Sequence, residues 1–314
     1  MIKRTLYFEN PAYLSMRLGQ LVVRKPEEEP LPEDSGSSAR YGKTPPRTVP
    51  IEDIGMIILD NKQITVTQGL MEALIDNNCA IVTCGSNHLP VGLMLPLYCN
   101  TIQNERFRQQ IDASLPLKKQ LWQQTVQAKI HNQEAVLYYS TGERHNNMSV
   151  WEKQVKSGDS DNMEARAAAY YWKTVFPENP YFIRGQFEDA PNNMFNYAYA
   201  ILRAVIARAL VASGLLPTLG IHHHNRYNAY CLADDIMEPY RPYADKIVID
   251  IIKSDGIPAS LSKDIKIKLL SLPTMEVVIN GKRSPLMVAA GQTTASLAKC
   301  FSGEIRKMAY PEMT

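Results

Sequence analysis

Short apolar stretches without a helical period mark the first part of the chain. The strand-like runs lie at residues 6–8, 13–16, 21–23, 53–59, 63–67 and 80–83. A helix-like segment at residues 69–76 precedes the last of them. Runs of this length, rich in branched and aromatic side chains, are typical of β-strands. The pattern therefore predicts a small β-rich domain over residues 1–95.

Residues 26–48 interrupt this β-rich region with a different composition. The segment contains five prolines, an acidic cluster at residues 27–29 and a serine-rich stretch at residues 35–38. A segment rich in Pro, Glu and Ser buries too little apolar surface to offset the entropy of ordering its backbone. We expect a flexible, solvent-exposed loop here.

From about residue 100, apolar side chains recur at helical spacing among Gln, Lys and Arg. Two such segments are residues 106–113 and 117–130. The clearest helix spans residues 193–213, where apolar positions repeat at i, i+3, i+4 and i+7 until Gly214. A strand at 276–279, a turn at Asn280-Gly281 and a last helix at 286–301 follow. The fold class predicted is α+β: the β-rich domain, then a larger all-helical domain over residues 96–314.

Composition places the chain among globular proteins. Of its 314 residues, 45% are hydrophobic and 21% charged, which is enough to build ordinary cores. The longest uncharged apolar stretch, residues 89–99, is broken by two prolines and is shorter than the roughly 20 residues that span a bilayer. The N-terminus has no signal-peptide pattern, and the five cysteines form no Cys-x-x-Cys pair. We expect a cytoplasmic protein with reduced thiols and no membrane contact.

The net charge is only +2, with an isoelectric point of about 8.2. This value by itself does not indicate a nucleic-acid-binding protein. The segment 26–48, however, carries five acidic and three basic residues, so the rest of the chain has a net charge of +4. A locally positive surface therefore remains compatible with the total.

Three polar clusters in the second domain could carry chemistry. Glu164 begins an alanine-rich helix, where an acidic residue is also favoured simply by the helix dipole. Three consecutive histidines, residues 222–224, follow Gly220, and adjacent side chains cannot all bind one ion. Asp235 and Glu238 stand three residues apart on one helix face, just before helix-breaking Pro239. Carboxylates with one imidazole suit Mg²⁺ or Mn²⁺ better than zinc.

The residues in and around these clusters resemble the CRISPR adaptation integrases, the endonucleases that insert spacers, in their type II form. The matching strings are Asn162-x-Glu164-Ala165-Arg166-Ala167-Ala168, Tyr171-Trp172, Asn196-Tyr197-Ala198-Tyr199, Leu219-Gly220-Ile221-His222-His223, Leu232-x-x-Asp235-Ile236-Met237-Glu238-Pro239-Tyr240-Arg241-Pro242 and a C-terminal stretch at 285–300. Order, spacing and length agree over nearly the whole chain. Two small departures are Ala165 and Ala198, where the family often has glycine.

The resemblance implies an N-terminal β domain that mediates dimerisation and a helical catalytic domain with a divalent metal. Carried over by motif position, the metal-binding and catalytic residues are Glu164, His223 and Glu238. Asp235 and His222 are expected to support these ligands. The neighbours of His223 leave the choice of imidazole open, and the number of metal ions is not defined. Arg166, Arg184 and Arg241 are candidates for DNA contact, and each could equally pair with a structural carboxylate.

The implied reaction is a transesterification in which the 3′-hydroxyl of an incoming DNA end attacks a phosphodiester at the edge of a CRISPR repeat. The implied partners are double-stranded DNA (prespacer and repeat), a second copy of the chain, a small adaptation subunit that bridges two dimers, and other type II adaptation proteins. A neutral histidine ligand predicts that activity falls below about pH 6.5. The alternatives are a stand-alone metal-dependent nuclease on branched DNA, a DNA-binding scaffold without activity, and a non-haem iron oxygenase.

Overall fold

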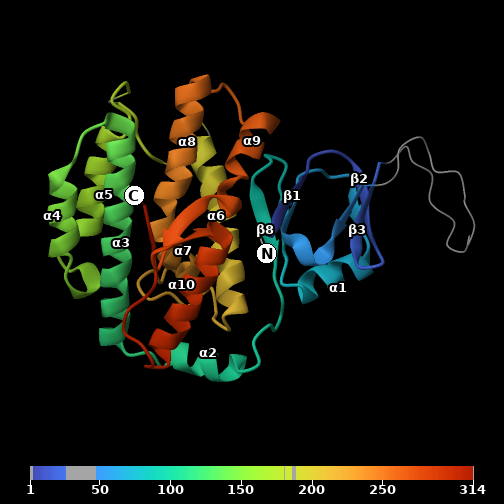
Figure 1. Ribbon diagram of the computed structural model, residues 1–314, viewed down its shortest axis with the longest axis horizontal. Coiled ribbons are helices and arrows are strands. Elements are labelled where there is room, and N and C mark those ends of the chain that lie inside the picture. The colour runs from blue at the N-terminus through green and yellow to red at the C-terminus, as the bar shows by residue number, and fades with distance from the viewer. Residues whose placement is uncertain (1–2, 26–46, 180, 186–188, 314) are drawn as a thin grey trace, which may run out of the picture. The chain divides into compact units, whose positions relative to one another are not determined.

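The computed structural model describes residues 3–25, 47–179, 181–185 and 189–313. The chain divides into two compact units, residues 1–97 and 98–314, each with its own core (Figure 1). Most of the predicted loop, residues 26–46, lies outside the described residues. Residues 47 and 48, which were assigned to that loop, belong instead to a strand because they pair with the preceding hairpin.

The described residues of the first unit form two four-stranded sheets. One sheet has the order β1 (Arg4–Phe8), β5 (Ile54–Leu59), β7 (Ala80–Cys84), β8 (Pro90–Met94). The other has the order β4 (Arg47–Pro50), β3 (Gln20–Arg24), β2 (Ala12–Arg17), β6 (Ile64–Val66). The predicted strands agree with these bounds to within two residues. Helix α1 (Gln68–Asp76) completes the unit.

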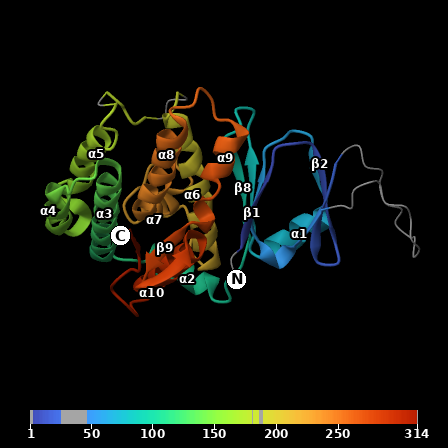
Figure 2. The ribbon, with the colours of Figure 1, turned by 45° about the horizontal axis from the view of Figure 1, so that its top comes forward.

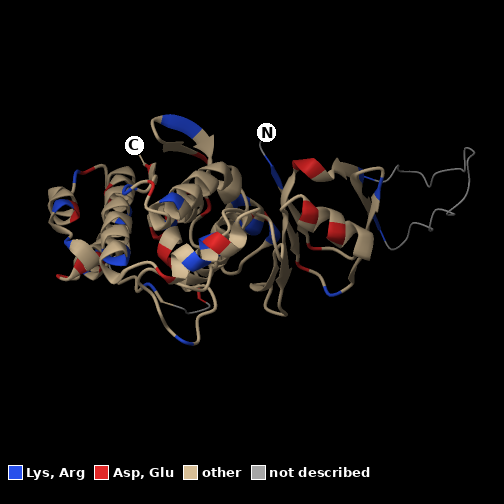
Figure 3. Ribbon diagram, turned by 90° about the horizontal axis from the view of Figure 1, so that it is seen from below, with Lys and Arg blue, Asp and Glu red and all other residues tan. Residues whose placement is uncertain are grey.

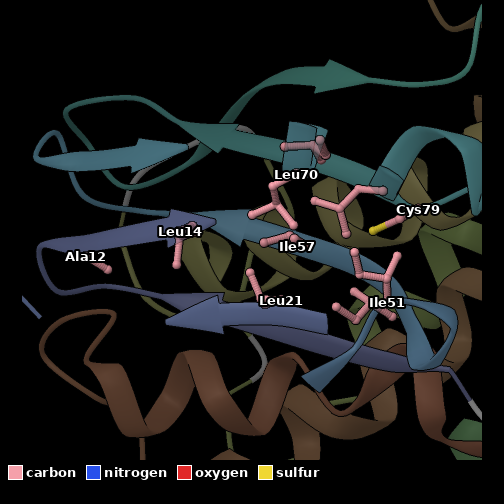
Figure 4. Packing of buried hydrophobic residues seen from close by; sticks show 10 residues of the cluster. Ala12, Leu14, Leu21, Ile51, Ile57, Leu70 and Cys79 are labelled. Atoms are coloured by element: carbon pink, nitrogen blue, oxygen red, sulfur yellow. The ribbon is translucent and has the colours of Figure 1, made fainter. Parts of the chain in front are cut away.

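Alternation along the strands builds the core of this unit. In β2, Ala12 and Leu14 are buried whereas Tyr13 between them is exposed, as the two-residue period of a strand requires. Strand β5 is central in its sheet, and five of its six residues are buried. Figure 4 shows Leu14, Leu21 and Ile57 meeting Leu70 of α1 in one apolar cluster. Each Å² of apolar surface buried in this cluster stabilises the fold by about 25 cal/mol.

The second unit is built mainly from helices. They are α2 (Gln103–Ile111), α3 (Leu115–Thr141), α4 (Asn146–Gln154), α5 (Met163–Thr174), α6 (Asn192–Ala212), α7 (Cys231–Met237), α8 (Arg241–Asp255), α9 (Lys263–Leu269) and α10 (Leu286–Phe301). Short 3₁₀ turns are η1 (Ile51–Asp53) in the first unit and η2 (Ser157–Asp159), η3 (Glu238–Tyr240) and η4 (Leu272–Thr274) in the second. Helix α3 packs against α4, α5 and α8 (Figure 1).

Helix α3 is much longer than the predicted segment 117–130. It begins after Ser114, whose hydroxyl accepts a hydrogen bond from the Leu117 amide, and ends at Gly142, whose φ is +76°. The left-handed conformation at Gly142 stops the helix at little steric cost. The second half was missed because its buried positions include polar side chains, such as Asn132 and Gln133, which hide the apolar period.

Helix α6 forms the centre of the second unit and agrees with the predicted helix 193–213 to within one residue. By length and composition it could also cross a membrane, but 72% of its apolar window is buried within the protein. Burial of this extent is that of a core helix. Cys79, Cys231 and Cys300 are buried as well.

The second unit also contains a small sheet. Strands β10 (Lys282–Pro285), β9 (Glu276–Ile279) and β11 (Pro311–Glu312) pair antiparallel, next to α10 (Figure 2). The second unit is therefore largely rather than entirely helical, because the predicted strand at 276–279 pairs with β10 after the turn and with the C-terminal strand β11. The α+β fold class, with a β-sheet region followed by a mainly helical region, is confirmed.

Candidate metal centre

Lys129 lies at the centre of the candidate site. Its side chain leaves the middle of α3, is only 6% exposed, and places Nζ 2.6 Å from Glu164 Oε1 and 2.6 Å from Glu238 Oε2. Burial opposes the charged form of the lysine, but the two carboxylates outweigh it and raise its pKa. Two residues predicted as ligands from separate motifs thus meet around one cation.

Glu164 is held by the first turn of α5. The carboxylate of Asp159 in η2 accepts hydrogen bonds from the backbone amides of Met163 and Glu164, at 2.8 and 3.0 Å. First-turn amides have no acceptor within the helix, so the carboxylate supplies one. Its negative charge at the helix N-terminus also interacts favourably with the helix dipole. Asp159 therefore fixes the start of α5 and with it the backbone position of Glu164.

Glu238 occupies the break between α7 and α8, as the prolines around it predict. Pro239 lies in the 3₁₀ turn η3, and its carbonyl accepts a hydrogen bond from Asn132 Nδ2 of α3 at 2.7 Å. Arg241 Nη2 lies 3.0 Å from Glu238 Oε1. Burial acts to raise the pKa of Glu238, but Arg241 and Lys129 outweigh it and lower that pKa. The carboxylate is therefore ionised and anchored to α3.

Asp235 organises the histidine segment. Its buried carboxylate accepts hydrogen bonds from the amides of Ile221, His222 and His223, at 2.7, 3.0 and 3.1 Å, and it contacts His223 Nδ1 at 2.5 Å. A Cβ on Gly220 would lie 2.2 Å from the His223 carbonyl oxygen and 2.8 Å from Asp235 Oδ2. Only glycine fits at position 220, so steric contact explains why glycine stands three residues before His223.

The three histidines have different surroundings. The His223 ring donates from Nδ1 to Asp235, which leaves the Nε2 lone pair available to a metal. The His222 ring stacks on Trp122, with centroids 4.1 Å apart and an interplanar angle of 1°. His224 is exposed, and its Nδ1 bonds the carbonyl of His222. These contacts favour His223 as the ligand.

The electrostatic surroundings distinguish His222 from His223. Burial lowers the pKa of His222 below its usual value. The hydrogen bond to Asp235 raises the pKa of His223, and Glu238 and Glu164 also act in that direction. The charges of both glutamates thus favour the protonated form of His223.

The donor set fits a hard divalent ion. Two carboxylates and an imidazole with a free Nε2 are ligands that Mg²⁺ and Mn²⁺ accept. Glu238 Oε2 is buried and accepts no well-oriented hydrogen bond, although the Lys129 ammonium lies close to it. As the described side chains stand, no three of His, Cys, Asp and Glu approach closely enough to hold an ion. Glu164, His223 and Glu238 are therefore suitable ligands for such a metal, and the Lys129 ammonium lies between the two carboxylates.

A cavity of about 200 Å³ adjoins this centre. Its lining residues are Lys129, Gln133, Ala168, Trp172, Arg184, Gly185, Tyr199, Arg241 and Asp245. Asp245 accepts hydrogen bonds from Tyr199 at 2.6 Å and Tyr171 at 3.0 Å, yet burial raises its pKa to about 6. The guanidinium groups of Arg184 and Arg241 both lie over the Tyr199 ring, at 5.1 and 5.0 Å from its centroid. The cavity is therefore basic and aromatic.

The structure separates the three candidate DNA-binding arginines. Arg184 and Arg241 border the cavity, whereas Arg166 is exposed on α5 and lies over the Trp151 ring at 5.0 Å. In the part of the chain that the structure describes, the other basic and acidic positions are interspersed (Figure 3). A positive surface in this protein is therefore local.

Lys129 and Trp122 were missed as parts of the centre. No motif in the sequence marks Lys129, which lies in a segment rich in Gln and Lys. The available signal was its spacing: Trp122, Val126, Lys129 and Gln133 follow one another at intervals of four, three and four residues, so the lysine falls on the buried face of α3. A lysine in that register needs buried acidic partners.

Similarity to known proteins extends over most of the chain. A family model described as CRISPR associated protein Cas1 matches residues 6–269. The CRISPR-associated endonuclease Cas1 of Neisseria meningitidis serogroup C is 34% identical over 316 residues, which covers 100% of this chain and 97% of that protein.

Solved structures share the fold. A casposase bound to an integration product superposes with a TM-score of 0.76 at 20% identity, over 98% of this chain and 92% of that one. A chain of a complex of Cas6, RT, Cas1 and Cas2 superposes with a TM-score of 0.70 at 17% identity, over 97% of this chain and 35% of that longer one.

Proposed function

This chain belongs to the Cas1 family of CRISPR-associated endonucleases, and on that premise we propose that Glu164, His223 and Glu238 form its catalytic metal centre. Its activity is that of a CRISPR adaptation endonuclease and integrase. We propose the type II form, in which new spacer DNA is inserted into the repeat array by attack of a 3′-hydroxyl on a phosphodiester. The observation that carries the proposal is that the two glutamates, 74 residues apart, converge on one ammonium group, that of Lys129.

The chemical difficulty is negative charge, which collects on the phosphate oxygens and the leaving oxygen in the transition state. Mg²⁺ or Mn²⁺ bound by these residues would stabilise that charge and lower the pKa of the attacking or leaving hydroxyl. Asp235 keeps the His223 proton on Nδ1, so the ring presents its lone pair from Nε2. His222, stacked on Trp122, and the Asp235 carboxylate hold the loop in place.

Residues beside the centre are suited to DNA. Arg184 and Arg241 border the cavity next to Glu238, and a guanidinium pairs well with phosphate oxygens. Arg241 is also held by Glu238, so we assign it to positioning as well as to phosphate contact. Exposed Arg166 on α5 would contact the DNA backbone farther from the reacting phosphate.

Assembly completes the proposal. Double-stranded prespacer and repeat DNA are the substrates, and two copies of the chain form a dimer through the β-rich domain, residues 1–95. A small adaptation subunit bridges two such dimers, and other type II adaptation proteins join them in the cytoplasm. The catalytic domain is residues 96–314.

An integration assay tests the function. The protein is incubated with the small partner subunit, a short DNA duplex and a plasmid that carries a repeat, with Mn²⁺ or with chelator. Joined products that depend on Mn²⁺ and arise at the repeat edge are expected.

The alternative is a stand-alone metal-dependent nuclease on branched DNA, which uses the same residues with water as nucleophile. It predicts Mn²⁺-dependent nicking and cleavage of branched duplexes. Nicking without any joined product, even with the partner subunit present, would select this alternative.

The activity should decrease as the pH is lowered, because His223 must be neutral to bind a metal. Its hydrogen bond to Asp235 raises the pKa of the ring above the usual 6.5. At subsaturating metal, protons therefore displace the ion as pH falls through a value above 6.5, and binding is complete at higher pH. Mn²⁺ affinity and joining rate measured between pH 5 and 8.5 check this. A profile that stays flat down to pH 5 contradicts a histidine ligand.

A further inference from the structure

We propose that Lys129 is an internal placeholder: its ammonium stands where the metal binds in the metal-free protein, and it moves into the adjoining cavity when the ion enters. The inference rests on the proposed metal centre and adds a residue to it. The primary observation is geometric, since one Nζ lies 2.6 Å from a carboxylate oxygen of each glutamate ligand.

The charges of the metal-free centre already balance. Lys129 and Arg241 neutralise Glu164 and Glu238, and three contacts of 3.0 Å or less join the four side chains in the order Glu164, Lys129, Glu238, Arg241. Without a cation between them, the buried carboxylate of Glu238 and the partly buried carboxylate of Glu164 would repel each other. Lys129 thus permits the ligands to be assembled before any metal arrives.

Entry of a divalent ion reverses this balance. A metal held by both carboxylates adds two positive charges beside a buried ammonium, which is only 6% exposed. The ammonium and the ion would compete for the same oxygens, so the lysine has to leave them.

The cavity supplies a place for the displaced side chain. Lys129 and Gln133 are four residues apart on the same face of α3, and both line the cavity. Gln133 is 3% exposed, and its Oε1 is buried without a hydrogen-bond partner among the described residues. A buried acceptor without a donor is costly, and the Lys129 ammonium can supply the donor.

The displaced ammonium would make the cavity more positive. It would then share the cavity with Arg184 and Arg241, which also line it. Three cations around one cavity favour a phosphate group. Metal entry would in this way prepare the cavity for the DNA backbone.

Metal affinity of the variant Lys129→Met tests the proposal without any measurement of activity. Mn²⁺ binding is measured by calorimetry or electron paramagnetic resonance for wild type, Lys129→Met and the control Lys118→Met, an α3 lysine away from the centre. We expect Lys129→Met to bind at least about tenfold more tightly, because no ammonium competes for the carboxylates. We expect the control to match wild type.

The variant should also melt at a lower temperature without metal and gain a larger stabilisation from Mn²⁺ than wild type. Equal or weaker Mn²⁺ binding by Lys129→Met overturns the placeholder and leaves the metal centre intact. Absence of Mn²⁺ binding by both proteins overturns the metal centre and the placeholder together.

Wild-type protein provides a second measurement if Lys129→Met does not fold. The ¹⁵N–¹H signal of the buried Lys129 ammonium, assigned with Lys129→Arg, is followed during a Mg²⁺ titration. A shift that saturates with metal supports displacement, and an unchanged signal in Mg²⁺-bound protein overturns it.

Discussion

Replacing Glu238 with glutamine is expected to lower Mn²⁺-dependent nicking and joining by at least about a hundredfold. Loss of a residue that merely supports a ligand typically costs 10–100-fold, and Glu238 is itself a proposed ligand. The amide keeps the shape of the side chain but removes the charge that Lys129 and Arg241 neutralise. Nicking and joining are measured with partner subunit and DNA, and Mn²⁺ affinity is measured in parallel.

The Glu238→Gln experiment separates catalysis from folding. Glu164→Gln should give a similar loss, because both carboxylates approach the same point. The control Glu276→Gln changes an exposed carboxylate on β9 that pairs with Arg283, where an ion pair is worth only about 0–1 kcal/mol, and it should retain activity. Melting curves show whether each variant is folded. Full nicking and joining by folded Glu238→Gln and Glu164→Gln would contradict the proposed metal centre. It would favour the alternative in which the chain is a DNA-binding scaffold.

Asparagine in place of Asp235 should cost about 3 kcal/mol of folding free energy and 10–100-fold in metal affinity. The buried carboxylate accepts hydrogen bonds from three successive amides and from His223 Nδ1. An amide side chain has a single acceptor oxygen, so its NH₂ group faces a donor and leaves that donor unsatisfied. The His223 tautomer is also no longer fixed. Chemical denaturation and Mn²⁺ titration measure the two effects.

The surface variant Asp255→Asn serves as the control for Asp235→Asn. Asp255 ends α8 and pairs with Lys268, and both side chains are well exposed. The change should leave stability within about 0.5 kcal/mol and metal affinity unchanged. If Asp235→Asn retains wild-type metal affinity, Asp235 does not position the histidine, and another group orients the ring.

The fold could be predicted where the apolar period is uninterrupted. Helix α6 and strand β5 present continuous apolar faces, so both agree closely with the sequence prediction. Helix α3 was predicted too short, because Asn132 and Gln133 are buried polar residues on its inner face. Asn132 is satisfied by the carbonyls of Pro239 and Pro311, which lie more than 100 residues away in the sequence. Partners at that separation leave no local pattern.

The candidate site was likewise predicted only in part. The residue types and motif spacing alone nominated Glu164, the histidine segment and the pair Asp235 and Glu238, and the prolines correctly marked the helix break at Glu238. Local sequence left the three histidines nearly equivalent. Their difference arises from Trp122 under His222 and Asp235 beside His223, contacts between separate elements.

The sequence by itself thus determined the most regular strands and helices, the family resemblance and the residues able to bind a metal, because each depends on nearby positions along the chain. The tertiary structure alone decided which of these side chains meet and which charges oppose them. Lys129 is the clearest case: its two partners are 35 and 109 residues away, and only packing of α3 against α5 and η3 brings its ammonium between their carboxylates. A side chain acquires such a role from burial and from neighbours in space, which one-dimensional spacing does not contain.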